Sequence, residues 1–536
     1  MPRRFVSGVA AAALLFAAGA AAAQDFSAQR LSDEIRIISA DDFQGRYPGT
    51  EGEKKTLDWL QAQYEAMGLE PGGPNGQWLQ VIDLKRYTPV ADAAKASWSG
   101  ADGQVHALTA GTDILLRAVS NDGQAAIANA GVVFVGYGIT APERGWDDYG
   151  DLDVTGKIVL VLGGEPDGDL FNGPYATTYQ SGSYKADEAK RRGAVGIITA
   201  SRSLSTDMSW TRTAQSNSRT RTLTPGAADL EFSGAINADV LKTMGVDVLE
   251  LAKRAETGDF RAFVLPGMTL SVETAETTDT LRTHNLLAKI PGTKRPNETI
   301  IYSAHWDHVG VNEHAAGDDK IFNGAWDNAS GTVGVLEMAR QLKAAPAPDR
   351  TIVFAHMAAE EMGLLGAYAY AADPVYPLET TVADINIDML PLSGPTRDVP
   401  IFGKGQNSLE DDLQALAEKE GRYVSDDGQP EQGFYYRSDH FPFARAGVPA
   451  LMPWHGVDWV EGGREAGLAA WKARFGADYH QPSDEWSADW DLRSAVENLT
   501  LLYRLGLQLA NSDEWPTWKP TSEFGQVRAV SDAVRR

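Results

Sequence analysis

Residues 299–390 constrain the fold of this chain more than any other stretch, because three apolar runs alternate there with segments of helical spacing. The apolar runs are residues 300–304, 351–355 and 382–387. Each has the length of a buried strand, and residues 333–342 and 364–368 carry the helical pattern between them. This alternation predicts βαβ units in an α/β fold, with a mostly parallel mixed sheet flanked by helices.

Metal-binding side chains follow each predicted strand. They are His305 and Asp307 after the first strand, Asp327 before the helical segment, Glu360 and Glu361 after the second strand, and Asp388 after the third. In open α/β sheets, ligands bind outside the carboxyl ends of the strands, so we expect these groups to gather there. The chain contains no cysteine. Imidazole and carboxylate ligands without thiolates favour zinc, with cobalt or manganese as alternatives.

An ordinary structural role is available for each of these residues. Asp327 could cap the helix that follows, because aspartate is a usual N-cap residue. Glu360 and Glu361 could simply favour a helix N-terminus. In the metal interpretation, one glutamate binds a cation and its neighbour takes a proton from water. His356, inside its strand, is interpreted as a core residue.

Charge and composition exclude several classes of protein. The net charge of −25 and the absence of cysteine argue against nucleic acid, disulfides and cysteine nucleophiles. Residues 1–23 have a basic start, an apolar stretch at 5–16 and alanines at 21–23, which is typical of a signal peptide. We therefore expect cleavage near Ala23, a periplasmic or secreted protein, and no membrane span in the mature chain.

The length of 536 residues indicates more than one domain. After about residue 116 the pattern changes to short strands, at 130–138, 157–163 and 194–200, with one helix at 185–192. Residues 201–228 are interpreted as an exposed loop. The predicted organisation is a main α/β domain at 24–123 and 271–511, a smaller α+β insert at 124–270, and a tail at 512–536.

Six motifs resemble those of the co-catalytic di-zinc aminopeptidases. They are HWD, WDNASG, AAEEMGLLGA, NIDM, RSDHFPF and YHQPSDEW. The resemblance covers residues 283–511 and extends weakly to 40–84 through QGRYPGT. The wider superfamily includes glutamate carboxypeptidase, the transferrin receptor and glutaminyl cyclase. The insert resembles a protease-associated domain through VGYGITAPE, KIVLVLGG and KADEAKRRGAVGII.

The resemblance implies two zinc ions per chain and a role for each candidate residue. Asp327 would bridge the ions, with His305 and Asp388 on one and Glu361 and His480 on the other. Glu360 would be the general base, Asp307 would orient His305, and Tyr435 or its neighbour Tyr436 would bind the substrate carbonyl. In the family the peptide bond after the bridging aspartate is often cis.

The implied function is that of an exported aminopeptidase acting on peptides. A carboxypeptidase or dipeptidase of the same superfamily is an alternative, because Arg437 and Arg445 could face a substrate carboxylate. Glutaminyl cyclase uses one zinc ion, and the complete second ligand set argues against it. A non-enzymatic, receptor-like scaffold is the remaining alternative, although no ligand is missing. The sequence leaves the oligomeric state open.

Overall fold

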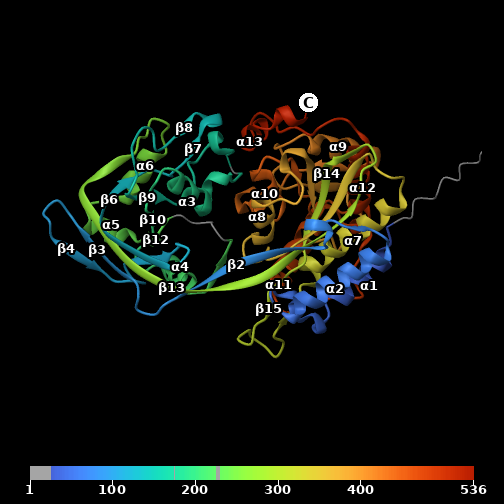
Figure 1. The fold of residues 1–536 in the computed structure, drawn as a ribbon, viewed down its shortest axis with the longest axis horizontal. Helices are drawn as coiled ribbons and strands as arrows, with labels where there is room; N and C mark the ends of the chain where they lie inside the picture. The colour runs from blue at the N-terminus through green and yellow to red at the C-terminus, as the bar shows by residue number, and fades with distance from the viewer. Residues whose placement is uncertain (1–25, 174, 225–229, 536) are drawn as a thin grey trace, which may run out of the picture.

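Two lobes make up the computed structural model, which describes residues 26–173, 175–224 and 230–535. Figure 1 shows that the long strand β13 (Phe263–Ile290) runs from one lobe into the other. It pairs with β17 in the larger lobe and with β6 in the smaller lobe. The predicted signal peptide lies outside the described residues.

The larger lobe is built on a mixed sheet of order β21-β18-β14-β17-β13. Its other strands are β21 (Ala450–Leu451), β18 (Thr381–Asn386), β14 (Arg295–His305) and β17 (Arg350–Met357), with β2 (Leu79–Pro89) and β1 (Glu70–Pro71) paired to β13. β21, β18, β14 and β17 run parallel, and β13 is antiparallel to β17. The predicted α/β fold is confirmed, with the three predicted strands as β14, β17 and β18.

Successive residues of β14 point to opposite faces of this sheet, and helices cover both faces. Ile300 and Tyr302 pack into one core and Ile301 into another. The first face is covered by α1 (Ala28–Ile38), α2 (Glu51–Ala66), α7 (Gly331–Ala344), α9 (Leu409–Lys419) and α12 (Arg493–Asn511). The second face is covered by α8 (Leu365–Ala372) and α10 (His440–Arg445). With both faces apolar, the polar groups concentrate at the strand ends.

The smaller lobe has a second sheet, of order β13-β6-β9-β10-β12-β5, with β3 paired to β13 and β4 to β3. Its strands are β3 (Lys95–Ser99), β4 (Val105–Leu108), β5 (Ile114–Ala118), β6 (Gln124–Phe134), β9 (Ile158–Leu162), β10 (Gly196–Ala200) and β12 (Phe232–Ile236). Its helices are α3 (Gly182–Arg191), α4 (Met208–Asn217), α5 (Ala238–Thr243) and α6 (Val248–Ala255). This is an α+β arrangement, as the sequence predicts for the insert.

Strand pairing extends the smaller lobe further toward the N-terminus than the predicted boundary at residue 124. β3, β4 and β5 join the second sheet, so its sequence begins by Lys95. The expected loop at 201–228 contains α4 and the short strand β11 (Arg221–Leu223), which pairs with β2. α4 buries only Trp210 among its residues, so it lacks the apolar stripe by which a helix is recognised in sequence.

Smaller elements and the C-terminal segment complete the larger lobe. They include two short strand pairs, β15 (Gly310–Val311) with β16 (Ile321–Phe322) and β19 (Asp398–Pro400) with β20 (Tyr423–Ser425), and the helices α11 (Gly463–Asp478) and α13 (Gly525–Ala529). Near the C-terminus, Trp518 donates to the carbonyl of Gly447, and Phe524 is buried beside Tyr435. Within the described ranges, none of the helices combines the length and apolarity that crossing a bilayer requires.

Candidate metal centre

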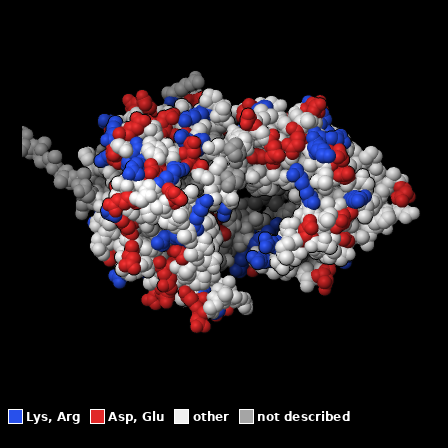
Figure 2. Space-filling view, turned by 180° about the vertical axis from the view of Figure 1, so that it is seen from behind, with Lys and Arg blue, Asp and Glu red and all other residues white. Residues whose placement is uncertain are grey.

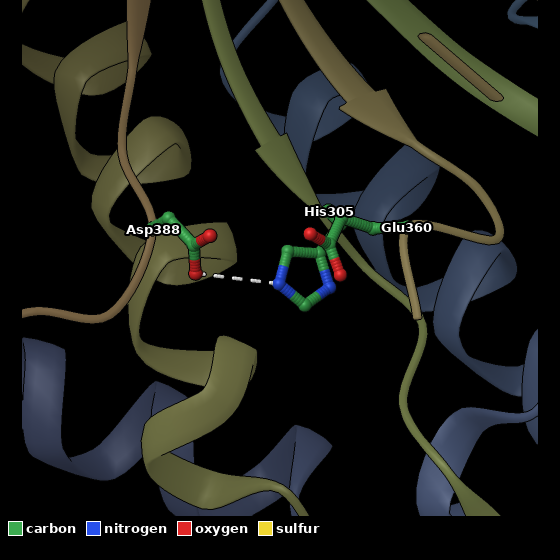
Figure 3. A group of neighbouring side chains, drawn as sticks. All are labelled: His305, Glu360 and Asp388. Carbon is green, nitrogen blue, oxygen red and sulfur yellow. Dashed lines mark hydrogen bonds and ion pairs between the residues drawn. The ribbon is translucent and has the colours of Figure 1, made fainter. Parts of the chain in front are cut away.

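The carboxyl ends of three neighbouring strands bring the predicted ligands together. His305 ends β14, which is flanked by β17 and β18, and Glu360 and Asp388 follow those two strands. Figure 3 shows His305, Glu360 and Asp388 around one point. Ligand atoms of these three residues lie within 4.8 Å of one another, as do those of His305, Asp327 and Glu361. The expected gathering at one edge of the sheet is therefore present.

Asp327 lies on the short helical turn η6 (Ala325–Ser330), and its backbone is fixed by a carboxylate from far along the chain. The N–H groups of Trp326 and Asp327 donate to the two oxygens of Asp484, over 2.8 and 3.0 Å. The preceding Gly324 has φ +56°, and a Cβ there would lie 2.3 Å from the Asp327 carbonyl oxygen, so only glycine fits. The Asp327–Asn328 peptide bond is cis, as the family resemblance implies.

Asp327 stands between two histidines, with one carboxylate oxygen facing each ring. Its Oδ1 lies 3.3 Å from Nε2 of His305, and its Oδ2 lies 3.2 Å from Nε2 of His480. Nε2 of His305 is also 3.3 Å from Oδ1 of Asp388, and Nε2 of His480 is 2.9 Å from Oε2 of Glu361. Each histidine therefore meets Asp327 and one further carboxylate.

These separations fit the donor spacing around zinc. Zinc binds nitrogen and oxygen at about 2.0–2.2 Å, so two donors on one tetrahedral ion lie about 3.3–3.6 Å apart. Three of the four histidine–carboxylate distances are 3.2–3.3 Å, and only the His480–Glu361 distance is shorter. The residues present therefore fit two ions that share Asp327.

The charge of the cluster also favours bound cations, because the buried carboxylates outnumber the positively charged side chains beside them. Burial raises the pKa of Glu360 well above its usual value, although His305 opposes this shift. Burial also raises the pKa of Asp307, to about 7. For His480, burial lowers the pKa, but hydrogen bonds to Asp327 and Glu361 outweigh it and raise the pKa to about 10. A bound cation would compensate this negative charge.

Asp307 orients the centre mainly through the backbone. Its Oδ1 accepts the N–H of Glu360 at 3.0 Å, which ties the loop after β17 to the end of β14. Nδ1 of His305 lies 3.1 Å from the Asp307 carbonyl oxygen and 3.9 Å from its carboxylate. Asp307 therefore holds both the predicted base and the predicted ligand in place.

Two further side chains orient the ligand carboxylates. The Ser438 hydroxyl donates to Oδ2 of Asp388 at 2.6 Å and accepts from the Asn386 amide at 2.7 Å. Nδ1 of His308 lies 2.6 Å from Oε1 of Glu361. The sequence analysis assigned no role to His308 or Asp484. Their only sequence signal is proximity, since they lie three residues after His305 and four after His480.

The buried Arg46 braces the loops that carry the centre. Its guanidinium donates to the carbonyls of Trp306, Asn323 and Gly324, which flank His305 and Asp327 in sequence. Burial lowers its pKa to about 10. Arg46 belongs to the QGRYPGT motif and links that motif to both ligand loops.

Three tyrosines near the centre differ in their surroundings. The Tyr435 hydroxyl is buried and has no hydrogen-bond partner among the described residues. Burial raises its pKa, and the carboxylates of Glu523, Glu410 and Asp384 raise it further. The Tyr436 hydroxyl donates to Glu523 at 3.1 Å. Tyr479 stacks on His480 at 3.8 Å between ring centres. Burial raises the pKa of Tyr479, and Asp327, Glu361 and Glu360 raise it further. Of these three tyrosines, Tyr479 is the one whose pKa responds to the proposed ligands.

Comparison with known proteins identifies the same region. Residues 285–503 match the model of peptidase family M28. A probable lipoprotein aminopeptidase, LpqL, of Mycobacterium tuberculosis is 25% identical over 353 residues, which cover 63% of this chain and 59% of that protein. Aminopeptidase YwaD of Bacillus subtilis is 33% identical over 175 residues, or 31% of this chain and 35% of that protein. The chain thus matches less than two thirds of either relative.

Among solved structures, an aminopeptidase from Aneurinibacillus sp. strain AM-1 aligns over 91% of this chain and 95% of its own, with a TM-score of 0.47 and 20% identity.

Proposed function

We propose that this protein is a zinc-dependent aminopeptidase that releases N-terminal residues from peptides, because residues 285–503 match the model of peptidase family M28. One observation carries the proposal: the two oxygens of Asp327 each face a different histidine at 3.2–3.3 Å. A carboxylate in that position suits a shared ligand of two cations. The aminopeptidase names of the two relatives support the direction of cleavage.

The proposed ligand assignment divides the residues between two ions. His305 and Asp388 hold one ion, Glu361 and His480 hold the other, and Asp327 holds both. Glu360 also lies within 4.8 Å of His305 and Asp388 at its ligand atoms. Unlike Asp327, Glu361 and Asp388, Glu360 forms no ion pair with His305 or His480, which leaves its carboxylate available for proton transfer.

The chain's own residues supply the proton transfers and the orientation. Bound zinc ions would polarise the scissile carbonyl and make the attacking water more acidic. Glu360 takes a proton from that water as the new C–O bond forms, and gives it to the amine nitrogen as the C–N bond breaks. Asp307 holds the backbone of Glu360 during both transfers. We propose Tyr479, whose ring stacks on that of His480 at 3.8 Å, in preference to Tyr435, as the donor to the carbonyl oxygen as it becomes anionic.

Aminoacyl anilides with free and with acetylated amino groups test the direction of cleavage. We expect hydrolysis of the free-amine substrate only, its loss on chelation, and its recovery on addition of Zn²⁺. Cleavage of N-blocked peptides at their C-terminus would instead support the carboxypeptidase alternative. Arg445, one of the two cations considered for that role, is paired with Asp187 of the smaller lobe.

Substitution of the proposed base separates catalysis from metal binding. Glu360→Gln should lower kcat by more than about 10³-fold while zinc content stays near two ions per chain, because the base is not a ligand. The matched control is Glu313→Gln, on an exposed loop, which should leave activity unchanged. Retained turnover in Glu360→Gln would remove the proposed role of Glu360, and a fall in zinc content would make it a ligand.

We also propose that the protein is exported, on the strength of residues 1–23. Mass spectrometry of the protein purified from its natural source should find an N-terminus near Gln24. An N-terminus at Met1 would contradict export by signal-peptide cleavage.

A further inference from the structure

A cleft of about 1140 Å³ lies between the two lobes and borders the loop that carries Glu360 and Glu361, where the Gly363 N–H donates to the Glu360 carbonyl. One wall includes Gly363–Leu365, which begins two residues after the proposed ligand Glu361, together with Tyr368 of α8. The other wall is formed by the smaller lobe. Figure 2 shows the hollow between the lobes, with Lys and Arg side chains gathered along its edge. A peptide whose N-terminus lies at the metal centre can leave along this cleft.

The wall on the smaller lobe is one face of its sheet. Alternate residues of β5 point into the cleft, namely Leu115 and Arg117, while Leu116 and Ala118 pack into the core of the lobe. Further cleft residues from the same lobe are Val119, Val161, Ile197, Thr199, Ser233 and Ala235. The apolar residues of this wall are nearly buried, and Thr199, Ser233 and Ala235 are partly exposed, so the wall offers an extended peptide a small surface with two hydroxyls.

Positive charge distinguishes the cleft from the rest of the molecule. Its described lining contains five cationic side chains, Arg117, Lys185, Lys190, Arg221 and Arg445, but one acidic side chain, Asp187. The whole chain carries a net charge of −25. Asp187 forms an ion pair with Arg445, so the acidic group of the lining is already neutralised. The other four cationic side chains belong to the smaller lobe, and groups behind the lining offset part of their charge, as Glu276 does for Arg117.

Arg221 carries the part of this positive charge that a ligand can reach. Arg117 makes a bidentate pair with the buried Glu276, at 2.7 and 2.8 Å, and so satisfies that carboxylate. Arg221 meets the same carboxylate only at 3.5 Å, through the Nη2 that donates to the Ala118 carbonyl at 2.6 Å. Its Nε is buried, so the donor left for a ligand is Nη1, which has no hydrogen-bond partner among the described residues. Two guanidinium groups thus share one carboxylate. The Arg221 side chain is 24% exposed, which leaves it open to the cleft.

We infer that Arg221 binds a carboxylate of the peptide substrate on the C-terminal side of the scissile bond. The enzyme then favours peptides whose negative charge lies far enough beyond that bond to meet Arg221. The inference rests on the proposed aminopeptidase function. Planar guanidinium groups with free donors are well suited to carboxylates. Both a C-terminal carboxylate and an acidic side chain have the required chemistry.

Paired peptides measure this preference. A series of Leu-glycine peptides of increasing length is prepared as free acids and as C-terminal amides, with a third set ending in glutamate amide. At one length we expect kcat/KM about fivefold higher for the acid than for the amide, the size of a partly exposed ion pair, and a smaller ratio at high salt. The glutamate amides separate the two sources: a shared preference indicates that any carboxylate is bound, and a preference for the free acids alone indicates the C-terminus.

Substitutions at Arg221 test the residue itself. Arg221→Gln should reduce the acid-to-amide ratio to about one, and Arg221→Lys should retain most of it. The matched control is Arg219→Gln, which removes an equal charge two residues away from an exposed side chain outside the described cleft lining. Thermal unfolding of each variant shows that it is folded.

Leucine anilide, which carries no carboxylate, separates the inference from the function on which it rests. Its hydrolysis should be equal in wild type, Arg221→Gln and Arg219→Gln. If wild type does not cleave the anilide, the proposed function fails. If the anilide is cleaved but acids and amides are equal at every length, or if Arg221→Gln keeps the full preference, the role of Arg221 is refuted.

Discussion

Asp484 gives the sharpest test of how the bridging ligand is held, because it lies outside the proposed ligand set. Its two oxygens accept the N–H groups of Trp326 and Asp327 at 2.8 and 3.0 Å, and its side chain is buried. Asp484→Ala would leave both buried amides without an acceptor. Each unsatisfied amide costs about 1–3 kcal/mol, so we expect a loss of about 2–6 kcal/mol in the free energy of unfolding.

The charge of Asp484 places the result within that range. Burial, and then repulsion by Asp327, disfavours this charge, so its removal in Asp484→Ala moves the loss toward the lower end. Asp484→Asn keeps one acceptor oxygen but turns an amide donor toward the second N–H. Its loss should therefore be about half as large, about 1–3 kcal/mol. Because the loop carrying Asp327 is less well held, zinc affinity should fall in both variants.

Urea titration followed by tryptophan fluorescence measures the stability of the chelated protein, and competition with a chelator measures zinc affinity. Asp489→Ala, at an exposed position five residues further along, is the matched control and should change the free energy of unfolding by less than about 0.5 kcal/mol. If Asp484→Ala is as stable as this control, Asp484 does not hold the turn, and the explanation of the geometry at Asp327 is wrong.

Three further predictions concern neighbouring residues. Ser438→Ala removes the hydroxyl that donates to Asp388 and should weaken zinc binding about 10–100-fold; an unchanged affinity for zinc in a chelator competition would contradict this. Tyr479→Phe should lower kcat about 10–100-fold and Tyr435→Phe far less, and the reverse order in steady-state kinetics would return the carbonyl role to Tyr435. Burial raises the pKa of Asp384 to about 8 from 3.8, so the folded state keeps a proton that the unfolded state loses, and stability falls as pH rises from about 4 to 8. Asp384→Asn should therefore gain stability over wild type across that window, and a difference in unfolding free energy that does not change with pH would refute the cause.

The sequence predicts the core of the larger lobe well because its signals are local. β14, β17 and β18 are uninterrupted apolar runs, and His305 and Asp388 follow directly from where those runs end. Parallel strands then bring these residues to one edge of the sheet. His480 has no such local signal, and only the resemblance of its motif to a known family indicated its place.

The features that the sequence missed depend on contacts between distant residues. Asp484 acts on Trp326 across 158 positions, and Arg46 acts on Trp306 across 260. Neither belongs to a periodic pattern, so hydrophobic spacing carries no trace of their roles. The boundary of the smaller lobe was placed too late for the same reason. β3 and β5 join its sheet by pairing with β13 and β12, which lie more than a hundred residues further on.

A continuous β13 has a mechanical consequence for the way the lobes move. Over Glu276–Leu286 it is hydrogen-bonded along its length to β2, and β11 pairs with the other edge of β2, so the crossing between lobes is a narrow sheet rather than a tether. A narrow sheet of this kind twists and bends as a whole but resists stretching, because its strands are already extended. Any change in the width of the cleft between the lobes must therefore strain β13, whose C-terminal end pairs with β17. The loop after β17 carries Glu360 and Glu361. Distortion at one end of this narrow sheet is transmitted to the other.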